Sequence, residues 1–210
     1  MSNFNIEVRP FDHVLYHITN WWPWHTSIWI ALGQWSHYTH GGIVLRGSYE
    51  GDTETRDLVM DITASGVHIR PLASDVINGS NMMIMRAPAS HVYTKEHIAK
   101  LARFAWENQE LTGYSIPGLL SQLWYLLVGI GSSEDPPYVP SRFICTQMSS
   151  YVDRVCGEHD PCPRRRDAVT RPVDLVRHSD LEIVTERLTL AKTLASCYRP
   201  PRSRRMQLAE

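Results

Sequence analysis

Apolar residues in the first half of the chain recur in short stretches that predict β-strands. Some stretches alternate between apolar and polar residues, whereas others are continuous apolar runs, and polar turns separate them. The predicted strands cover residues 11–18, 38–45, 57–63, 67–70 and 82–86. Asp61 is unusual because it is a carboxylate inside an apolar frame.

Further along the chain, apolar residues adopt a helical spacing. In Lys95–Glu107 the residues Ile98, Leu101, Ala102 and Ala105 fall on one face, which predicts an amphipathic helix. Other helices are expected at residues 27–35, at residues 119–131 and from Cys145 onward. The apolar segment 119–131 is shorter than the ~20 residues of a membrane span, so it is interpreted as a buried or interfacial helix. Together these elements predict an α+β domain with a largely antiparallel sheet.

Composition narrows the class of protein. The 210 residues suit one domain, expected over residues 1–195, followed by a basic and disordered tail at 196–210. A net charge of -1 gives no reason to expect nucleic-acid binding. Four cysteines without a signal peptide predict free thiols and a cytoplasmic protein, with virion association or release at lysis as alternatives.

Cys145 is the first candidate for chemistry. It follows the proline-rich turn 135–140, and apolar residues at Ile144, Met148, Tyr151 and Val152 continue with helical spacing. Unpaired N–H groups and the positive end of the helix dipole stabilise a thiolate in a first turn. The alternative is an ordinary buried cysteine, because cysteine is among the most buried residue types.

His40 and Asp61 are the candidate partners of Cys145. His40 lies at the start of a short apolar strand, and Gly41 and Gly42 behind it allow a backbone or a substrate to approach closely. A cysteine, a histidine and a carboxylate that orients the histidine form a known nucleophilic constellation. His37 competes for the role of base, but in an extended segment it faces away from His40.

The order of these residues resembles the circularly permuted papain-like cysteine hydrolases, the permuted NlpC-type branch that includes YiiX-like proteins and relatives of lecithin retinol acyltransferase. The resemblance extends from about Asp12 to Val184. The matching segments are Thr39-His40-Gly41-Gly42-Ile43-Val44, Met60-Asp61, Gly66-Val67, Pro71-Leu72, Met82-Met83-Ile84-Met85-Arg86, Gly113-Tyr114, Cys145 and Thr170-Arg171-Pro172-Val173-Asp174-Leu175. The family's first strand begins with a Gly-Asp pair, of which this chain keeps Asp12.

The resemblance implies a papain-like fold and a cysteine hydrolase that acts through an acyl-enzyme and needs no cofactor. Cys145 would be the nucleophile, His40 the base and Asp61 the residue that orients the imidazole. Tyr114 would donate a hydrogen bond or line the substrate site. Gly41 and Trp35 are further candidates for substrate binding, Trp35 as a member of a tryptophan-rich segment that packs as core or forms a rim beside the site.

Several functions fit this resemblance. A cell-wall peptide amide is the favoured substrate, and lipid or thioester acyl groups are the alternative, so contact with a cell wall or a membrane surface is left open. A non-catalytic structural or virion protein is the alternative of another class, because a fold does not carry a function. The sequence does not predict the oligomeric state.

Cys156, His159 and Cys162 form the last pattern with chemical meaning. Two thiols that bracket an imidazole suggest metal binding, yet no fourth ligand or close C-x-x-C pair accompanies them. We therefore predict an ordinary loop without a metal, and a disulfide only in an oxidising compartment.

Overall fold

The computed structural model of the chain describes residues 7–17, 37–49, 55–63, 66–77, 82–108, 145–163, 170–188 and 206–208. The helices expected at residues 27–35 and 119–131 lie outside these residues, as do Trp35 and Tyr114.

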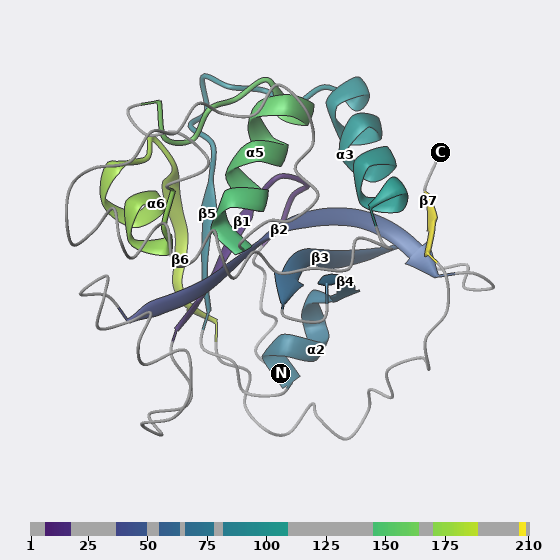
Figure 1. Cartoon of the computed structure of the whole chain (residues 1–210), viewed down its shortest axis with the longest axis horizontal. Helices are drawn as coiled ribbons and strands as arrows, with labels where there is room; N and C mark the ends of the chain where they lie inside the picture. The colour runs from purple at the N-terminus through teal and green to yellow at the C-terminus, as the bar shows by residue number, and fades with distance from the viewer. Residues whose placement is uncertain are drawn as a thin grey trace.

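An antiparallel sheet forms the centre of the molecule (Figure 1). Within the described residues its strand order is β4-β3-β2-β1-β5-β6, and every neighbouring pair is antiparallel. The strands are β1 (His13–His17), β2 (Tyr38–Tyr49), β3 (Arg56–Thr63), β4 (Gly66–Pro71), β5 (Met82–Arg86), β6 (Glu182–Leu188) and β7 (Met206–Leu208). The α+β class with an antiparallel sheet is thus confirmed. β7 pairs with β2 and lies within the segment that the sequence predicts to be a disordered tail.

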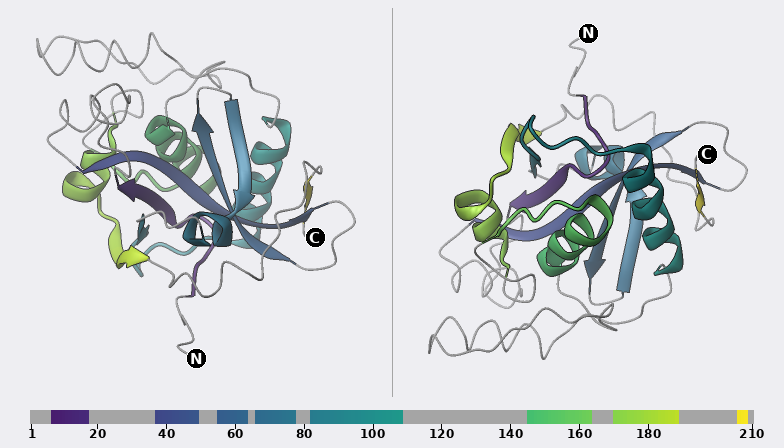
Figure 2. Two further views of the ribbon diagram at one scale, coloured as in Figure 1. Left: turned by 90° about the horizontal axis from the view of Figure 1, so that it is seen from below. Right: turned by 90° about the horizontal axis from the view of Figure 1, so that it is seen from above.

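Two long helices, α3 (Lys95–Glu107) and α5 (Cys145–Gly157), lie side by side over one face of the sheet (Figures 1 and 2). α2 (Leu72–Ile77) lies on the opposite side, and α6 (Pro172–His178) is near β6 (Figure 1). A capping box starts α3, because the Thr94 hydroxyl accepts a hydrogen bond from the His97 N–H and the Thr94 N–H donates to the His97 ring. No helix in the described part of the chain is long and apolar enough to cross a membrane.

The core beneath the two long helices explains why the apolar pattern produces these elements. It joins one side of the inner strands to the inward faces of both helices. Its largest fully buried members are Phe11, Ile43, Leu45, Leu58, Met60, Ile62 and Leu101. A second cluster, with Val14, Val44 and Val59, occupies the other face of the same strands. The inner strands are therefore buried on both faces, and apolar side chains point to both sides of the sheet.

The turn that leads into β1 contains a residue with a strained backbone. The Asp12 N–H donates to the Arg9 carbonyl over 3.0 Å, and Phe11 has a φ of 72°, as in a type II turn with Pro10 before it. The left-handed conformation costs a side-chain-bearing residue roughly 1–2 kcal/mol. Full burial of a phenylalanine contributes about 1.5–3 kcal/mol, and Phe11 is fully buried and stacks on Tyr93 with ring centres 4.2 Å apart. Burial therefore offsets the backbone strain at Phe11.

An ion pair joins this turn to β5. Arg86 donates from Nε and Nη2 to the two carboxylate oxygens of Asp12, over 2.8 and 2.7 Å. Asp12 is 1% exposed, so Arg86 offsets the cost of withdrawing its carboxylate from water. Asp12 and Arg86, which are far apart in the sequence, thus join β5 to the turn before β1.

We expect Arg86→Met to lower the free energy of unfolding by about 3 kcal/mol, because it leaves a buried carboxylate without its cation. Urea denaturation measures the change. Arg103→Met is the control, since Arg103 is exposed on α3 and its loss should change the stability by no more than about 0.5 kcal/mol. The double variant Asp12→Asn/Arg86→Met should lose less stability than the two single changes added together. Simple additivity would contradict a coupled pair.

Candidate active site

Cys145 is the first residue of α5, as the sequence predicts. The core holds the following turns of this helix through Met148, Tyr151 and Val152. Next to the cysteine, the buried Thr146 hydroxyl donates to the Thr170 carbonyl over 2.8 Å and ties the start of the helix to the segment before α6. The cysteine therefore lies at a fixed helix N-terminus.

Gly41 allows the start of α5 to approach β2. A Cβ atom at position 41 would lie 2.8 Å from Cγ2 of Thr146 and 3.3 Å from a methyl group of Leu15. The helix fills the space that the glycine leaves. Gly41 could allow either a backbone segment or a substrate to approach, and the structure shows the approach of a backbone segment. Gly42 plays the same part toward β3, where a Cβ would lie 2.9 Å from the Met60 carbonyl oxygen.

His40 lies between Cys145 and Asp61. Its Nε2 is 2.9 Å from Oδ2 of Asp61, whose side chain is fully buried. The strand register produces this contact, because Gly42 of β2 is opposite Asp61 of β3 and His40 is two residues away on the same face. The thiol of Cys145 hydrogen-bonds to the His40 side chain. Since Asp61 takes Nε2, Nδ1 is the ring nitrogen left for sulfur.

The electrostatics of these groups favour a thiolate and an imidazolium. Burial alone would raise the pKa of Cys145, but the charge and hydrogen bond of His40, with backbone hydrogen bonds from Gly41 and Thr146, lower it. Burial opposes the charge on His40 as well. The thiolate and the hydrogen bonds to Asp61 and Cys145 outweigh burial and raise the pKa of His40 to about 10.

Asp61 receives a second cation that the sequence did not reveal. Arg70 of β4 donates from Nη1 to the same Oδ2 over 2.6 Å. Burial tends to raise the pKa of Asp61, yet His40 and Arg70 hold it below its usual value. From strand alternation we expect Arg70 on a solvent-facing side of β4, and its side chain is 31% exposed. Only the strand order shows that this side carries Asp61.

The structure distinguishes the two candidate bases. His40 contacts both Asp61 and Cys145, whereas His37 is exposed at the end that precedes β2. The structure thus brings Cys145, His40 and Asp61 together. Tyr114 and Trp35 remain predictions, because they lie outside the described residues.

A second buried cluster of polar side chains lies farther along α5, centred on Asp153. One carboxylate oxygen is 2.9 Å from Nε2 of His13 and 3.0 Å from Nδ1 of His159, and Tyr93 donates to the other over 2.7 Å. Burial would raise the pKa of Asp153, but the hydrogen bonds from His13 and His159 lower it. These bonds fix the second half of α5 to β1 and to the loop after α5.

This cluster also accounts for His159 in the cysteine-rich loop. His159 binds Asp153 and, through Nε2, Asp180 at 3.2 Å. Cys156 and Cys162 are buried and are not joined in a disulfide. Among the described residues no group of His, Cys, Asp and Glu is arranged to hold a metal ion.

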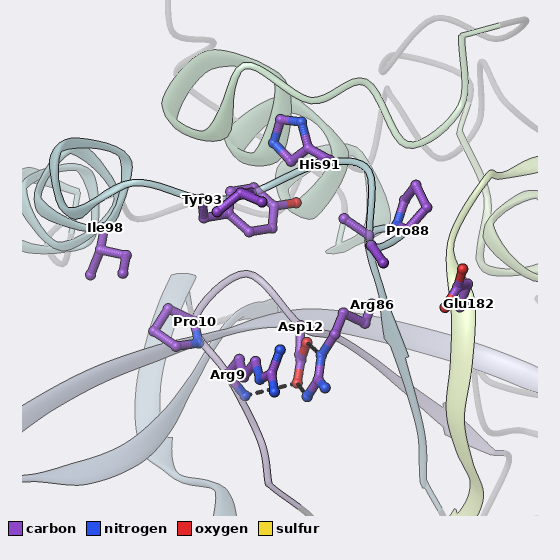
Figure 3. Close-up of a pocket in the computed structure, with 12 residues that line it drawn as sticks. Arg9, Pro10, Asp12, Arg86, Pro88, His91, Tyr93, Ile98 and Glu182 are labelled. Atoms are coloured by element: carbon purple, nitrogen blue, oxygen red, sulfur yellow. Dashed lines mark hydrogen bonds and ion pairs between the residues drawn. The ribbon is translucent and has the colours of Figure 1, made fainter.

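A cavity of about 490 Å³ opens near the other end of α5 (Figure 3). Its lining includes Arg9, Asp12, Arg86, His91 and Tyr93. His91 reaches the Gly157 carbonyl at the last residue of the helix, 3.1 Å away. Cys145 begins the same helix and does not line the cavity. This cavity is therefore not where the thiol and the imidazole meet.

No protein-family model and no curated protein matches this chain.

We expect Cys145 to be alkylated by iodoacetamide at pH 6 at least about 100-fold faster than Cys156. Both residues lie on α5 and are similarly buried, 5% and 4% exposed, so access is matched. They differ in ionisation, because burial raises the pKa of Cys156 to about 11 whereas that of Cys145 is lowered. Mass spectrometry of peptides after timed alkylation measures both rates. Equal rates at pH 6 would contradict an ionised Cys145.

Proposed function

We propose that the protein is a cysteine hydrolase that cleaves an amide or ester through a covalent acyl-enzyme. The observation that carries this proposal is the chain of contacts from the Cys145 thiol to the His40 imidazole and on to the buried Asp61 carboxylate. A nucleophile, a base and a group that orients the base form a known arrangement for acyl transfer. The thiol also stands at a helix N-terminus, where a thiolate is favoured.

Each step of the reaction has a group to perform it. The Cys145 thiolate attacks the substrate carbonyl carbon, and the backbone N–H of Cys145 would stabilise the oxyanion. The imidazolium of His40 donates its proton to the leaving nitrogen or oxygen as that bond breaks, which leaves a thioester. Neutral His40 then takes a proton from water, the hydroxide adds to the thioester, and the acid leaves as the thiolate re-forms.

The substrate class follows from the resemblance. The order of His, acidic residue and Cys along the chain, with the Cys on a helix packed against an antiparallel sheet, supports a circularly permuted papain-like fold. We propose a cell-wall peptide amide as the substrate. Lipid or thioester acyl groups are the alternative that the resemblance also supports.

We expect Cys145→Ala to abolish hydrolysis and thioester formation, because no other group in the proposed mechanism can hold the acyl chain. The assay is release of new amino groups from a peptidoglycan digest, run beside p-nitrophenyl acetate and a fatty-acyl thioester. Cys156→Ser is the matched control, since it alters another buried thiol of the same helix. Full activity in Cys145→Ala would refute the assignment. Absence of turnover and of thioester in the wild type would favour a non-catalytic protein.

His40→Ala should remove the fast alkylation of Cys145 at neutral pH, since the imidazole lowers the pKa of the thiol. His37→Ala should leave the rate within about twofold, because His37 lies exposed outside the contact chain. Asp61→Asn should slow turnover by about 10²-fold or more, since it removes the carboxylate that fixes the imidazole. Similar alkylation rates in the two histidine variants would leave no reason to prefer His40.

A further inference from the structure

The two oxygens of the buried Asp61 carboxylate have unequal numbers of hydrogen-bond partners. Oδ2 accepts hydrogen bonds from both His40 and Arg70, over 2.9 and 2.6 Å. Oδ1 is buried and has no hydrogen-bond partner among the described residues. A carboxylate has room for a partner on each oxygen, so two cations on one oxygen compete for the same negative charge.

We propose that Arg70 is a positioning residue that draws charge from Asp61 and thereby limits how tightly His40 holds its proton. The inference rests on the proposed hydrolase function, because it concerns the step in which His40 must act as a base. The guanidinium of Arg70 keeps its charge at any pH at which the protein is folded, so this competition is permanent.

The surroundings of Arg70 fix it in this role. In the β3–β4 register Asp61 is opposite His68, and Arg70 is two residues farther along the same face. Nη2 of Arg70 donates to the Tyr16 hydroxyl over 3.3 Å, and its guanidinium lies 5.7 Å from the centre of the Tyr16 ring. The Tyr16 ring in turn is 5.4 Å from the His40 ring. His40, Asp61, Arg70 and Tyr16 thus form a closed ring of contacts across β2, β3, β4 and β1.

The need for such a limit appears after the thioester forms. In the free protein the thiolate of Cys145 is a major reason for the high pKa of His40. Acylation converts the thiolate into a neutral thioester and removes that charge. Asp61 is then the remaining anion beside the imidazole. If Asp61 gave its full charge to His40, the imidazolium would persist and could not take a proton from water. Arg70 lowers this remaining stabilisation, so neutral imidazole is available near neutral pH.

The test uses Cys145→Ala, because the alanine removes the thiolate charge just as acylation does. The readout is the titration of the His40 ring, followed by NMR of ¹⁵N-labelled histidine. Among the described residues the titratable or charged groups around this ring are Asp61, Arg70, Tyr16 and, opposite Asp61, His68. The His68→Gln change is therefore made in every protein compared, so that the signals of His40 and His68 are not confused.

Adding Arg70→Met should raise the His40 titration midpoint by about one pH unit, since a cation at hydrogen-bond distance from the shared carboxylate is lost. Arg70→Lys should restore at least half of the difference because it keeps the charge. Arg46→Met is the matched control, because Arg46 is also a strand arginine that pairs with an aspartate of β3, Asp57 at 3.4 Å. It should leave the midpoint unchanged.

A midpoint that stays constant or falls in Arg70→Met would overturn the inference. If Arg70→Met does not fold, Arg70→Gln and Arg70→Lys decide it by the same measurement. The titration needs no substrate, so it gives an answer even if the proposed hydrolase activity fails. Where a thioester is observed, the rate of its hydrolysis can be followed against pH in Arg70→Met with Cys145 intact. The pH at which this rate falls on the acid side should be higher by the same amount as the His40 midpoint. The rate of thioester formation should change less.

Discussion

The close approach of the start of α5 to β2 is the constraint on which the candidate site depends. A helix that carries the thiol and a strand that carries the imidazole can meet only if no side chain separates them, and Gly41 supplies that space. The hydrophobic core under α5 and the hydrogen bond from Thr146 to Thr170 hold the start of the helix against Gly41. The lowered pKa of Cys145 and the raised pKa of His40 follow from this packing, because charges interact strongly at short range away from water.

Buried aspartates recur as the fixed points of the fold. Asp12 joins the turn before β1 to β5 through Arg86, Asp61 joins β3 to β2 and β4, and Asp153 joins α5 to β1 through His13. Each carboxylate is withdrawn from water, and each is bonded to a basic side chain from another element. Because an unpaired buried charge is costly, these contacts specify how the elements fit together. The partner is Arg86 for Asp12, His40 with Arg70 for Asp61, and His13 for Asp153. The pairing at Asp61 also has a chemical role in the proposed function.

Local patterns predicted much of the fold. The strand at residues 82–86 and the helix at Lys95–Glu107 have the predicted bounds, and β1 to β4 lie within a few residues of theirs. Cys145 begins a helix for reasons visible in the sequence, a proline-rich segment before it and helical spacing after it. β6 was not predicted, because its polar residues, such as Glu182 and Thr185, weaken the apolar signal. The contact of His40 with Asp61 agrees with a prediction made from the order of motifs.

Contacts that depend on strand order and helix placement could not be predicted. The sequence predicts Arg70 as a solvent-facing residue of a short strand. Its contact with Asp61 becomes apparent only when β3 is known to be the neighbouring strand. His13 and Asp153 are 140 positions apart, and nothing in either segment indicates the other. The left-handed conformation of Phe11 could not be predicted either, because the residue that stacks on it, Tyr93, lies in a distant part of the chain.

The long span of sequence between His40 and Cys145 has a consequence for when the site comes into being. In the proposed function, the base His40 and its carboxylate Asp61 leave the ribosome well before the nucleophile Cys145 during synthesis from the N-terminus. His40 can lower the pKa of Cys145 only once α5 has packed on the sheet. The proposed reactivity would therefore arise when α5 docks and not when the cysteine is synthesised.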